Sequence, residues 1–324
     1  MKRISVALGD YPHSRELLSG DVTVNGFEVE PVNVNPIIGA YRRMIRDLEF
    51  DVCELAPTSY LMARQKGIPL TAVPVFLNRR FHHSDIQCAG HSGISVPADL
   101  EGRKIGVRAY SVTTGVWVRG ILSSEYGVDV GQITWVVDDD DHIEGQWPAR
   151  IERVTDGRSL GALLNAEEID AAFTGNAGTG RAGAPAAGWT AVPANGTTAG
   201  EVAAYPLFPQ AEILAADWYL RTAVYPLHSV IALRADLVER EPELPSALYA
   251  ALAKSKQRQL AADPRWTALP RFGRQAQQVG GDPIPYGRSA NKVSLDALVR
   301  FSRDQGLIAS DPGEVFADGD YPDA

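Results

Sequence analysis

Two histidines stand in the same short sequence context at distant points of the chain. His83 begins His-Ser-Asp-Ile and His228 begins His-Ser-Val-Ile, so both share the pattern His-Ser-x-Ile at the start of an apolar run. A side chain that titrates near neutrality suits general acid catalysis, which typically contributes about 10²–10⁴-fold. A lone histidine is more often structural, but the repeated context makes this pair candidate proton donors. His82 directly precedes the first of them.

Arginines near these histidines could hold a negatively charged ligand. Arg79 and Arg80 are adjacent in sequence, and Arg108 follows the apolar run Ile105–Val107. A guanidinium group binds a carboxylate through two parallel, charge-assisted hydrogen bonds. The alternative for the adjacent arginines is a solvated surface pair, since two neighbours do not easily face one site. We expect at least one of the pair to contact a ligand.

The residues that open one predicted helix form a second candidate for anion binding. Ser111, Thr113 and Thr114 precede or begin a helical pattern, where free N–H groups and a partial positive charge suit a carboxylate. The alternative is ordinary N-capping by these hydroxyls. Tyr110, just before them, is a candidate for ligand contact or for ordinary packing.

Two single carboxylates complete the candidate site. Asp10 follows the first apolar run and Glu54 ends a later one, so either could accept a hydrogen bond from a phenol or share a proton. The acidic run Asp138–Asp141 favours a solvated loop over a metal site, because metal ligands are usually spaced along a scaffold. Gly175–Gly180 matches GxxGxG and not the dinucleotide pattern GxGxxG, which favours a loop. No metal and no cofactor are therefore predicted.

The elements that must position these groups alternate between strand and helix, which predicts βαβ units and mostly parallel sheets. Strands are expected at Ile4–Leu8, Phe50–Leu55, Leu70–Phe76, Lys104–Val107, Ile133–Val137, Ile169–Phe173 and His228–Leu233. Helices are expected at Tyr41–Leu48, Thr58–Gln65, Thr113–Tyr126, Ser159–Asn165, Pro245–Ala262 and Leu295–Gln305. The Gly-, Ala- and Thr-rich segment 175–200 is expected to be a loop.

The length of 324 residues fits two domains on a prior of roughly 100–200 residues each. We expect a discontinuous first lobe, residues 1–90 and 205–324, and an inserted second lobe, residues 91–204. A chain that leaves one lobe, builds another and returns must cross twice. The strands that follow His83 and His228 are interpreted as those crossovers, which would place both histidines near the hinge, at the floor of the cleft between the lobes.

Composition limits the partners and the compartment. The formal net charge of −9 argues against nucleic acid or an anionic membrane as partner. No run of about 18 apolar residues and no signal-peptide pattern is present, so a cytoplasmic protein is expected. Cys53 and Cys88 lie in apolar runs without zinc spacing, which favours buried thiols over a disulfide. The oligomeric state, monomer or homo-oligomer, is left open.

A series of motifs, in order along nearly the whole chain, resembles the 4,5-dihydroxyphthalate decarboxylase family. The resemblance is carried by Gly9-Asp10-Tyr11, Phe50-Asp51-Val52-Cys53-Glu54, Ser59-Tyr60, Pro74-Val75-Phe76, Arg79-Arg80-Phe81-His82-His83-Ser84, the run from Asp99 to Val107, the run from Thr113 to Leu122, Glu125-Tyr126-Gly127-Val128, Tyr225-Pro226-Leu227-His228 and Pro285-Tyr286-Gly287. The sequence departs from the family at Pro12–Arg15 and at His82, where the family commonly has arginine.

The resemblance implies the α/β, two-lobed type 2 periplasmic-binding-protein fold, with a mostly parallel sheet flanked by helices in each lobe and two crossover hinge strands. It implies cofactor-independent, non-oxidative removal of one carboxylate from a small aromatic acid, 4,5-dihydroxyphthalate, giving protocatechuate and carbon dioxide. Such a reaction needs a proton donor at a ring carbon, cations for the carboxylates and a polar group for the phenols. His83, His228 and Glu54 are the predicted catalytic residues. The predicted substrate-binding residues are Asp10, Arg79, Arg80, His82, Arg108, Tyr110, Thr113 and Thr114.

Two other functions fit the same fold, because function depends on the site and not on the fold. One is a non-catalytic solute-binding protein or sensor for a small aromatic or carboxylate ligand. The other is a different lyase or isomerase of small cyclic acids.

Overall fold

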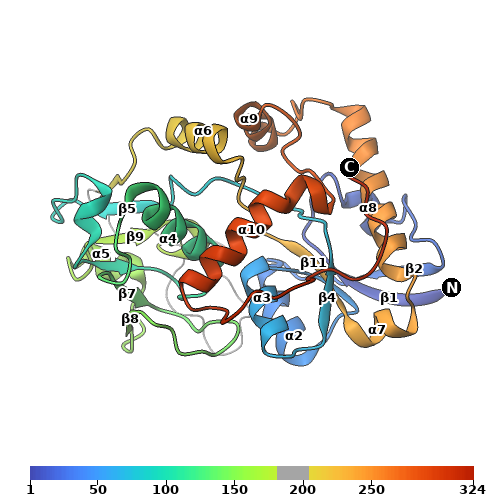
Figure 1. The fold of residues 1–324 in the computed structure, drawn as a ribbon, viewed down its shortest axis with the longest axis horizontal. Helices are drawn as coiled ribbons and strands as arrows, with labels where there is room; N and C mark the ends of the chain where they lie inside the picture. Colours follow the sequence, from blue (N-terminus) through green and yellow to red (C-terminus); the bar gives the residue numbers. More distant parts are fainter. Residues whose placement is uncertain (181–203) are drawn as a thin grey trace. The chain divides into compact units, whose positions relative to one another are not determined.

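The chain divides into two compact units in a computed structural model that describes residues 1–180 and 204–324. The first unit comprises residues 1–80, 219–299 and 310–324, and the second comprises residues 81–218 and 300–309 (Figure 1). The boundaries expected from sequence, at residues 90 and 204, both fall inside the second unit. The return of residues 300–309 to this unit has no counterpart in the expected division. Most of the loop expected at 175–200 lies outside the described residues.

The first unit is built on a five-stranded sheet in the order β2-β1-β3-β11-β4. Its strands are β1 (Lys2–Ala7), β2 (Phe27–Pro31), β3 (Val52–Leu55), β4 (Leu70–Val73) and β11 (Val230–Arg234). β1 pairs in parallel with β2 and β3, whereas β11 runs antiparallel to β3 and β4. Four strands therefore share one direction and β11 opposes them.

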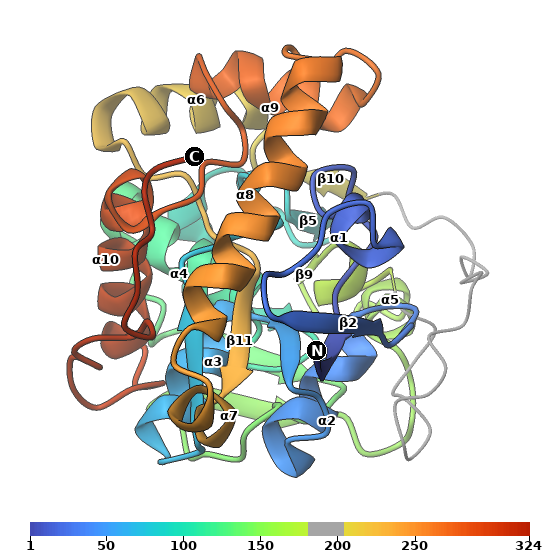
Figure 2. The same ribbon diagram turned by 90° about the vertical axis from the view of Figure 1, so that its right-hand side faces the viewer.

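Helices cover both faces of this sheet. They are α1 (Arg15–Ser19), α2 (Ile38–Asp47), α3 (Pro57–Gln65), α7 (Ala235–Arg240), α8 (Leu244–Ala262), α9 (Pro270–Val279) and the first part of α10 (Arg288–Asp304). Val52, Ile231 and Leu233 point to one face, where they join a core with residues of α1 and α8. Figure 2 shows the length of α8 beside these strands. α2 and α3 contribute nothing to that core and pack against β3 and β4 on the other face.

The second unit contains a six-stranded sheet in the order β10-β5-β9-β6-β7-β8. Its strands are β5 (Ile86–Ala89), β6 (Lys104–Gly106), β7 (Thr134–Val137), β8 (Arg150–Arg153), β9 (Ala171–Phe173) and β10 (Ala204–Pro206). β6 pairs in parallel with β7 and β9, and β7 pairs in parallel with β8. β5 is antiparallel to both of its neighbours, β9 and β10.

The helices α4 (Thr113–Tyr126) and α5 (Leu160–Asn165) pack within this unit, and most of α6 (Ala211–Thr222) also belongs to it. α5 packs its leucines against Ile169 and Ala172. On α4, the Trp117 ring meets the Phe301 ring edge to face, with centroids 5.8 Å apart. Phe301 also lies directly against Gly120, where a Cβ atom would come within 2.2 Å of the ring. Only glycine allows this approach of helix and ring.

The two strands that follow the His-Ser-x-Ile pattern are β5 and β11. In the described residues each is the one strand of its sheet that opposes the rest, so the repeated pattern marks a real structural correspondence between the units. The segments that precede β5 and β11 pair with each other. Arg79 forms an antiparallel bridge with Leu227, and the His228 N–H donates to the Asn78 carbonyl at 2.9 Å.

Both cysteines are buried free thiols, which confirms the prediction. Among the residues that the structure describes, no helix is long and apolar enough to cross a membrane.

Candidate active site

Glu54 is the most enclosed carboxyl group of the predicted site in the first unit. It lies in β3, which is parallel to β1, so it shares the carboxyl edge of the sheet with the residues that follow β1. Its Oε2 atom accepts from the Gly9 N–H at 2.9 Å, and its Oε1 atom accepts from the Tyr11 hydroxyl at 2.8 Å and the Tyr41 hydroxyl at 3.5 Å. Burial raises the pKa of the Glu54 carboxyl, although these hydrogen bonds oppose the shift. The carboxyl group is therefore more easily protonated than an exposed glutamate.

The Tyr11 ring packs against a cluster of aromatic side chains. Tyr11 stacks on His13 with ring centroids 5.5 Å apart, and His13 meets Trp266, Phe272 and Tyr286 edge to face. His13 Nε2 donates to the Leu77 carbonyl at 3.1 Å. Burial lowers the pKa of His13 to about 3, so this histidine is neutral near pH 7. His13 therefore holds Tyr11 in place, a role absent from the sequence-based expectations.

The two adjacent arginines differ in their surroundings. Arg79 is 2% exposed, and its guanidinium donates to Asn291 Oδ1 at 2.7 Å, to Ser294 Oγ at 3.0 Å and to the Tyr225 carbonyl. Burial lowers the pKa of Arg79 to about 10, which leaves it charged at neutral pH. Arg80 is only half-buried. Of the two, Arg80 is therefore better placed to reach a ligand.

The remaining predicted residues of this unit are less enclosed. His228 is half-buried and stands two residues before β11. Asp10 is exposed, and both of its carboxylate oxygens accept from Arg15, at 2.8 and 3.2 Å. Asp10 therefore lies in a surface ion pair, next to Gly9 but not hydrogen-bonded to Glu54.

A buried histidine–carboxylate pair lies in the second unit just before β5. His82 Nδ1 is 2.7 Å from Asp85 Oδ2, and both side chains are almost fully buried. A carboxylate can only accept, so Nδ1 carries the proton and the ring orientation is fixed. Asp85 is absent from the sequence-based candidates, although its spacing of three residues from His82 is a usable signal.

His83 occupies an aromatic niche in the same segment. Its ring meets Phe208 and Trp218 edge to face, at centroid distances of 5.9 and 5.7 Å. Neither ring nitrogen has a hydrogen-bond partner within the described part of the chain. Burial, and then the neighbouring His82, lower the pKa of His83 to about 4. The expectation of a side chain that titrates near neutrality therefore does not match this environment.

Arg108 and an acidic loop meet at the carboxyl ends of β6 and β7. Arg108 is 5% exposed, and its Nη1 atom lies 3.7 Å from Asp139 Oδ2. The prediction of a solvated loop at Asp138–Asp141 is wrong for its first two residues, since Asp138 and Asp139 are buried. The reason is their position directly after the buried strand β7, where Asp139 pairs with Arg108.

The start of α4 lies beside this loop. Thr113 and Thr114 are buried in the first turn, and the apolar Val112 occupies the N-cap without a side-chain hydrogen bond. Just before it, the N–H and hydroxyl of Ser111 donate to Asp141 Oδ1 at 2.7 and 2.6 Å. The helix start is thus not closed by a side chain of the N-cap residue, as a carboxylate site requires.

Tyr110 is buried and held by two neighbours. The Arg119 guanidinium lies 4.0 Å from the Tyr110 ring centroid and also donates to the Tyr110 carbonyl. Arg119 is in turn fixed by a 2.6 Å hydrogen bond to Gln305 Oε1. The Trp147 ring stacks with Tyr110 at 6.2 Å.

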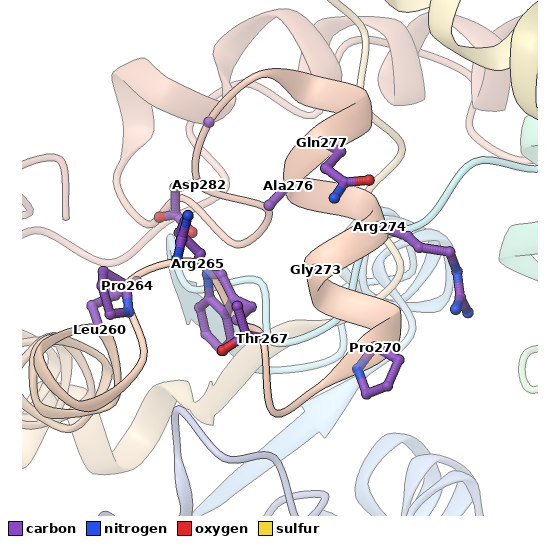
Figure 3. Close-up of a pocket in the computed structure, with 12 residues that line it drawn as sticks. Leu260, Pro264, Arg265, Thr267, Pro270, Gly273, Arg274, Ala276, Gln277 and Asp282 are labelled. Atoms are coloured by element: carbon purple, nitrogen blue, oxygen red, sulfur yellow. The ribbon is translucent and has the colours of Figure 1, made fainter.

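A separate cavity of about 880 Å³ lies in the first unit, between the end of α8, the turn that follows it and α9 (Figure 3). Its lining includes Trp266, Thr267, Gln277 and Asp282, and none of the predicted site residues. In the described residues, no group of three or more His, Cys, Asp or Glu side chains is arranged to hold a metal ion.

Comparisons with known proteins agree with the resemblance seen in sequence. Residues 42–151 match the family described as NMT1/THI5 like. The chain is 32% identical to 4,5-dihydroxyphthalate decarboxylase of Comamonas testosteroni, over 97% of this chain and 96% of that protein. It is 33% identical to the Pseudomonas putida protein of the same name, over 52% of this chain and 68% of that protein.

Solved structures show the same fold at low sequence identity. The sulfonate-binding protein SsuA of Methylobacillus flagellatus is 14% identical with a TM-score of 0.50, over 98% of this chain and 89% of that chain. The alkanesulfonate-binding protein SsuA of Xanthomonas axonopodis is 12% identical with a TM-score of 0.51, over 98% of this chain and 96% of that chain. These likenesses confirm the two-lobed type 2 periplasmic-binding-protein fold.

Proposed function

Because the chain belongs to the 4,5-dihydroxyphthalate decarboxylase family, we propose that it removes one carboxylate from 4,5-dihydroxyphthalate. The products are protocatechuate and carbon dioxide. The observation that carries this proposal is the similarity, over almost the entire chain, to a curated enzyme of that name. The buried titratable groups described above support it, because they supply the acid–base chemistry that this reaction needs.

The reaction is an exchange of carbon dioxide for a proton at one ring carbon. A proton is delivered to the carbon that bears the carboxylate, while the hydroxyl para to it gives up its proton. The ring then carries a carbonyl and has lost its aromaticity. The bond from the ring to the carboxylate breaks, its electron pair returns to the ring, carbon dioxide leaves and the ring oxygen regains a proton.

Glu54 suits the role of the group that takes and returns the phenol proton. Its raised pKa brings it closer to neutrality, where such exchange is most effective. Tyr11 donates to Glu54 and keeps acceptor capacity on its own oxygen. A substrate phenol can therefore donate to Tyr11 as Tyr11 passes its proton to Glu54.

The ring-carbon proton comes from His83 or His228 in this proposal. With a pKa of about 4, His83 is neutral at pH 7 before substrate binds. The negative charge of a bound phthalate would raise that pKa, because an opposite charge favours the imidazolium form. His82, oriented by Asp85, is the neighbouring group that could exchange a proton with it.

Independence from cofactors and a substrate position in the cleft between the lobes, both expected from sequence, remain parts of this proposal. The carboxylate groups are assigned to Arg80, Arg108 and the start of α4, where Thr113 and Thr114 lie. No step of the chemistry written above calls for an electron acceptor.

The test is release of carbon dioxide and protocatechuate from purified protein. We expect release from 4,5-dihydroxyphthalate and none from phthalate, which lacks the hydroxyl that stabilises the intermediate. Tight binding of both without any release would instead favour a solute-binding protein. Measuring His83→Ala and His228→Ala beside the wild type assigns the donor, since its loss should abolish turnover and leave binding intact.

A further inference from the structure

Arg271 lies in the first turn of α9, a helix that the sequence does not predict. Its Nη2 atom donates to Asn78 Oδ1 and lies 3.5 Å from the Arg79 carbonyl. Gln275, one turn later, donates to the same carbonyl at 2.7 Å. These contacts fix α9 against the segment that carries Arg80. The Arg271 guanidinium is therefore held in position by the protein and is not a freely moving surface cation.

Arg271 has no negative partner of its own. Both of its hydrogen-bond acceptors are neutral, and it forms no ion pair within residues 1–180 and 204–324. Its Nε and Nη1 atoms make no hydrogen bond in that part of the chain either. A guanidinium group has five N–H donors, so a planar pair of them stays available to a carboxylate.

The surroundings of Arg271 join it to the Glu54 site. Arg271 is an exposed residue, yet nearby protein removes part of its hydration and lowers its pKa. The Tyr11 phenol opposes that shift and the charge of Arg80 adds to it. Both groups therefore lie within range of Arg271. The next residue, Phe272, contacts His13, on which Tyr11 stacks.

The charge of Arg80 lies close enough to Arg271 to oppose its protonated form. A phthalate carries two carboxylates on neighbouring ring carbons, whereas its decarboxylated product carries one. A pair of arginines can bind both carboxylates of a phthalate, whereas the product offers only one carboxylate to the same pair. The phenol-handling groups Tyr11 and Glu54 lie in the same unit.

We propose that Arg271 joins the carboxylate-binding groups assigned above and, together with Arg80, sets a preference for a vicinal dicarboxylate over a monocarboxylate. The inference rests on the proposed function for the identity of the substrate. Its structural basis, a fixed and unneutralised arginine beside Tyr11, does not depend on turnover.

The experiment measures binding of phthalate and of benzoate by calorimetry, since neither has the hydroxyl needed for reaction. We expect Arg271→Gln to weaken phthalate binding by about 10- to 100-fold, the range of a charged hydrogen-bonded contact. Benzoate binding should change much less. Arg271→Lys should recover part of the loss, because it keeps the charge without the planar fork.

Arg274→Gln is the matched control, because it removes the same charge from the same helix. Figure 3 shows Arg274 extending away from α9, on the other side from Asp282. It should bind phthalate like the wild type. Equal losses in the Arg271 and Arg274 variants, or equal losses of phthalate and benzoate, would overturn the inference. A wild-type protein that binds phthalate no better than benzoate would overturn it as well.

Failure of the proposed function gives a different result. In that case the wild type releases no carbon dioxide, but Arg271→Gln still lowers phthalate binding selectively. Thermal denaturation of each variant shows whether the loss of the contact to Asn78 has unfolded the first unit. The Arg271→Lys variant keeps the assignment testable if the glutamine variant is unstable.

Discussion

Glu54 is a carboxyl group with little access to water and with three donors around it. Donors that hold the carboxylate form would normally lower its pKa, yet burial outweighs them and the pKa is raised. A raised pKa has no use in a carboxylate that only holds the structure together. It is useful in a carboxylate that must take up and release a proton.

Replacing Glu54 by glutamine tests this role. The amide keeps the size, and its one oxygen can accept from Tyr11 or from Gly9, whereas the carboxylate accepts from both. The amide cannot take up a proton. We expect kcat for 4,5-dihydroxyphthalate to fall by about 10²–10⁴-fold with little change in substrate affinity. Glu49→Gln is the control, since Glu49 is exposed and pairs with Arg43. A drop in affinity with unchanged kcat would assign Glu54 to binding only.

At the residue scale, sequence identifies candidate groups better than their partners. Glu54 and His83 could be selected because each ends or begins an apolar run. Their partners could not, because the contact of Tyr11 with Glu54 joins residues 43 positions apart. The register of parallel strands creates that contact, and a sequence alone does not give the register. Arg79 shows the converse, since nothing near it in sequence indicates its contacts with Asn291 and Ser294.

At the element scale, the sequence predicts α4 with its bounds and gives no signal for α9. α4 ends at Gly127 in the left-handed conformation, the usual stop signal of a helix, and its apolar positions recur at helical spacing. α9 is short and polar, with Gly273 inside it. Its stability comes from contacts such as Gln275 with the Arg79 carbonyl, which no local pattern encodes.

The contact of Gly120 with Phe301 gives a prediction about α4. Alanine is the better helix former by about 1 kcal/mol, but its methyl group would overlap the Phe301 ring. We expect Gly120→Ala to lower the free energy of unfolding by about 1–3 kcal/mol, measured by urea denaturation. In a Phe301→Ala background the same change should be neutral or stabilising. A penalty that persists there would show that the ring is not its cause.

At the scale of the whole molecule, the alternation of strands and helices was enough to predict two mostly parallel sheets. The division of the chain between the units was less accessible. The boundaries depend on tertiary contacts, such as those of Gln305 with Arg119, between segments 186 residues apart. The echo of His-Ser-x-Ile was informative because it lies before the reversed strand of each sheet.

The buried His13 makes global stability depend on pH. Its pKa is about 3 in the folded protein and about 6.5 when unfolded. Between these values the unfolded chain binds a proton that the folded chain does not. The free energy of unfolding should therefore fall as the pH drops, by about 2 kcal/mol from this residue between pH 7.5 and pH 5.

His13→Gln keeps a donor for the Leu77 carbonyl and removes the titration. Urea denaturation at pH 7.5 and pH 5 measures the fall in the free energy of unfolding. In His13→Gln this fall should be about 2 kcal/mol smaller than in the wild type. His91→Gln, at an exposed histidine, should behave like the wild type. An unchanged pH dependence in His13→Gln would mean that His13 is not buried as the structure shows.

The return of residues 300–309 to the second unit has a consequence for synthesis on the ribosome. Phe301 packs against Trp117, and Gln305 accepts a hydrogen bond from Arg119. The packing of α4 is therefore incomplete until a segment almost two hundred residues later has been translated. The sheet of the first unit is also incomplete at that stage, because β11 lies between β3 and β4 and is translated after most of the second unit. Neither unit can therefore finish folding as an independent early domain during translation. A nascent chain stalled before residue 300 would leave α4 exposed to chaperones and proteases.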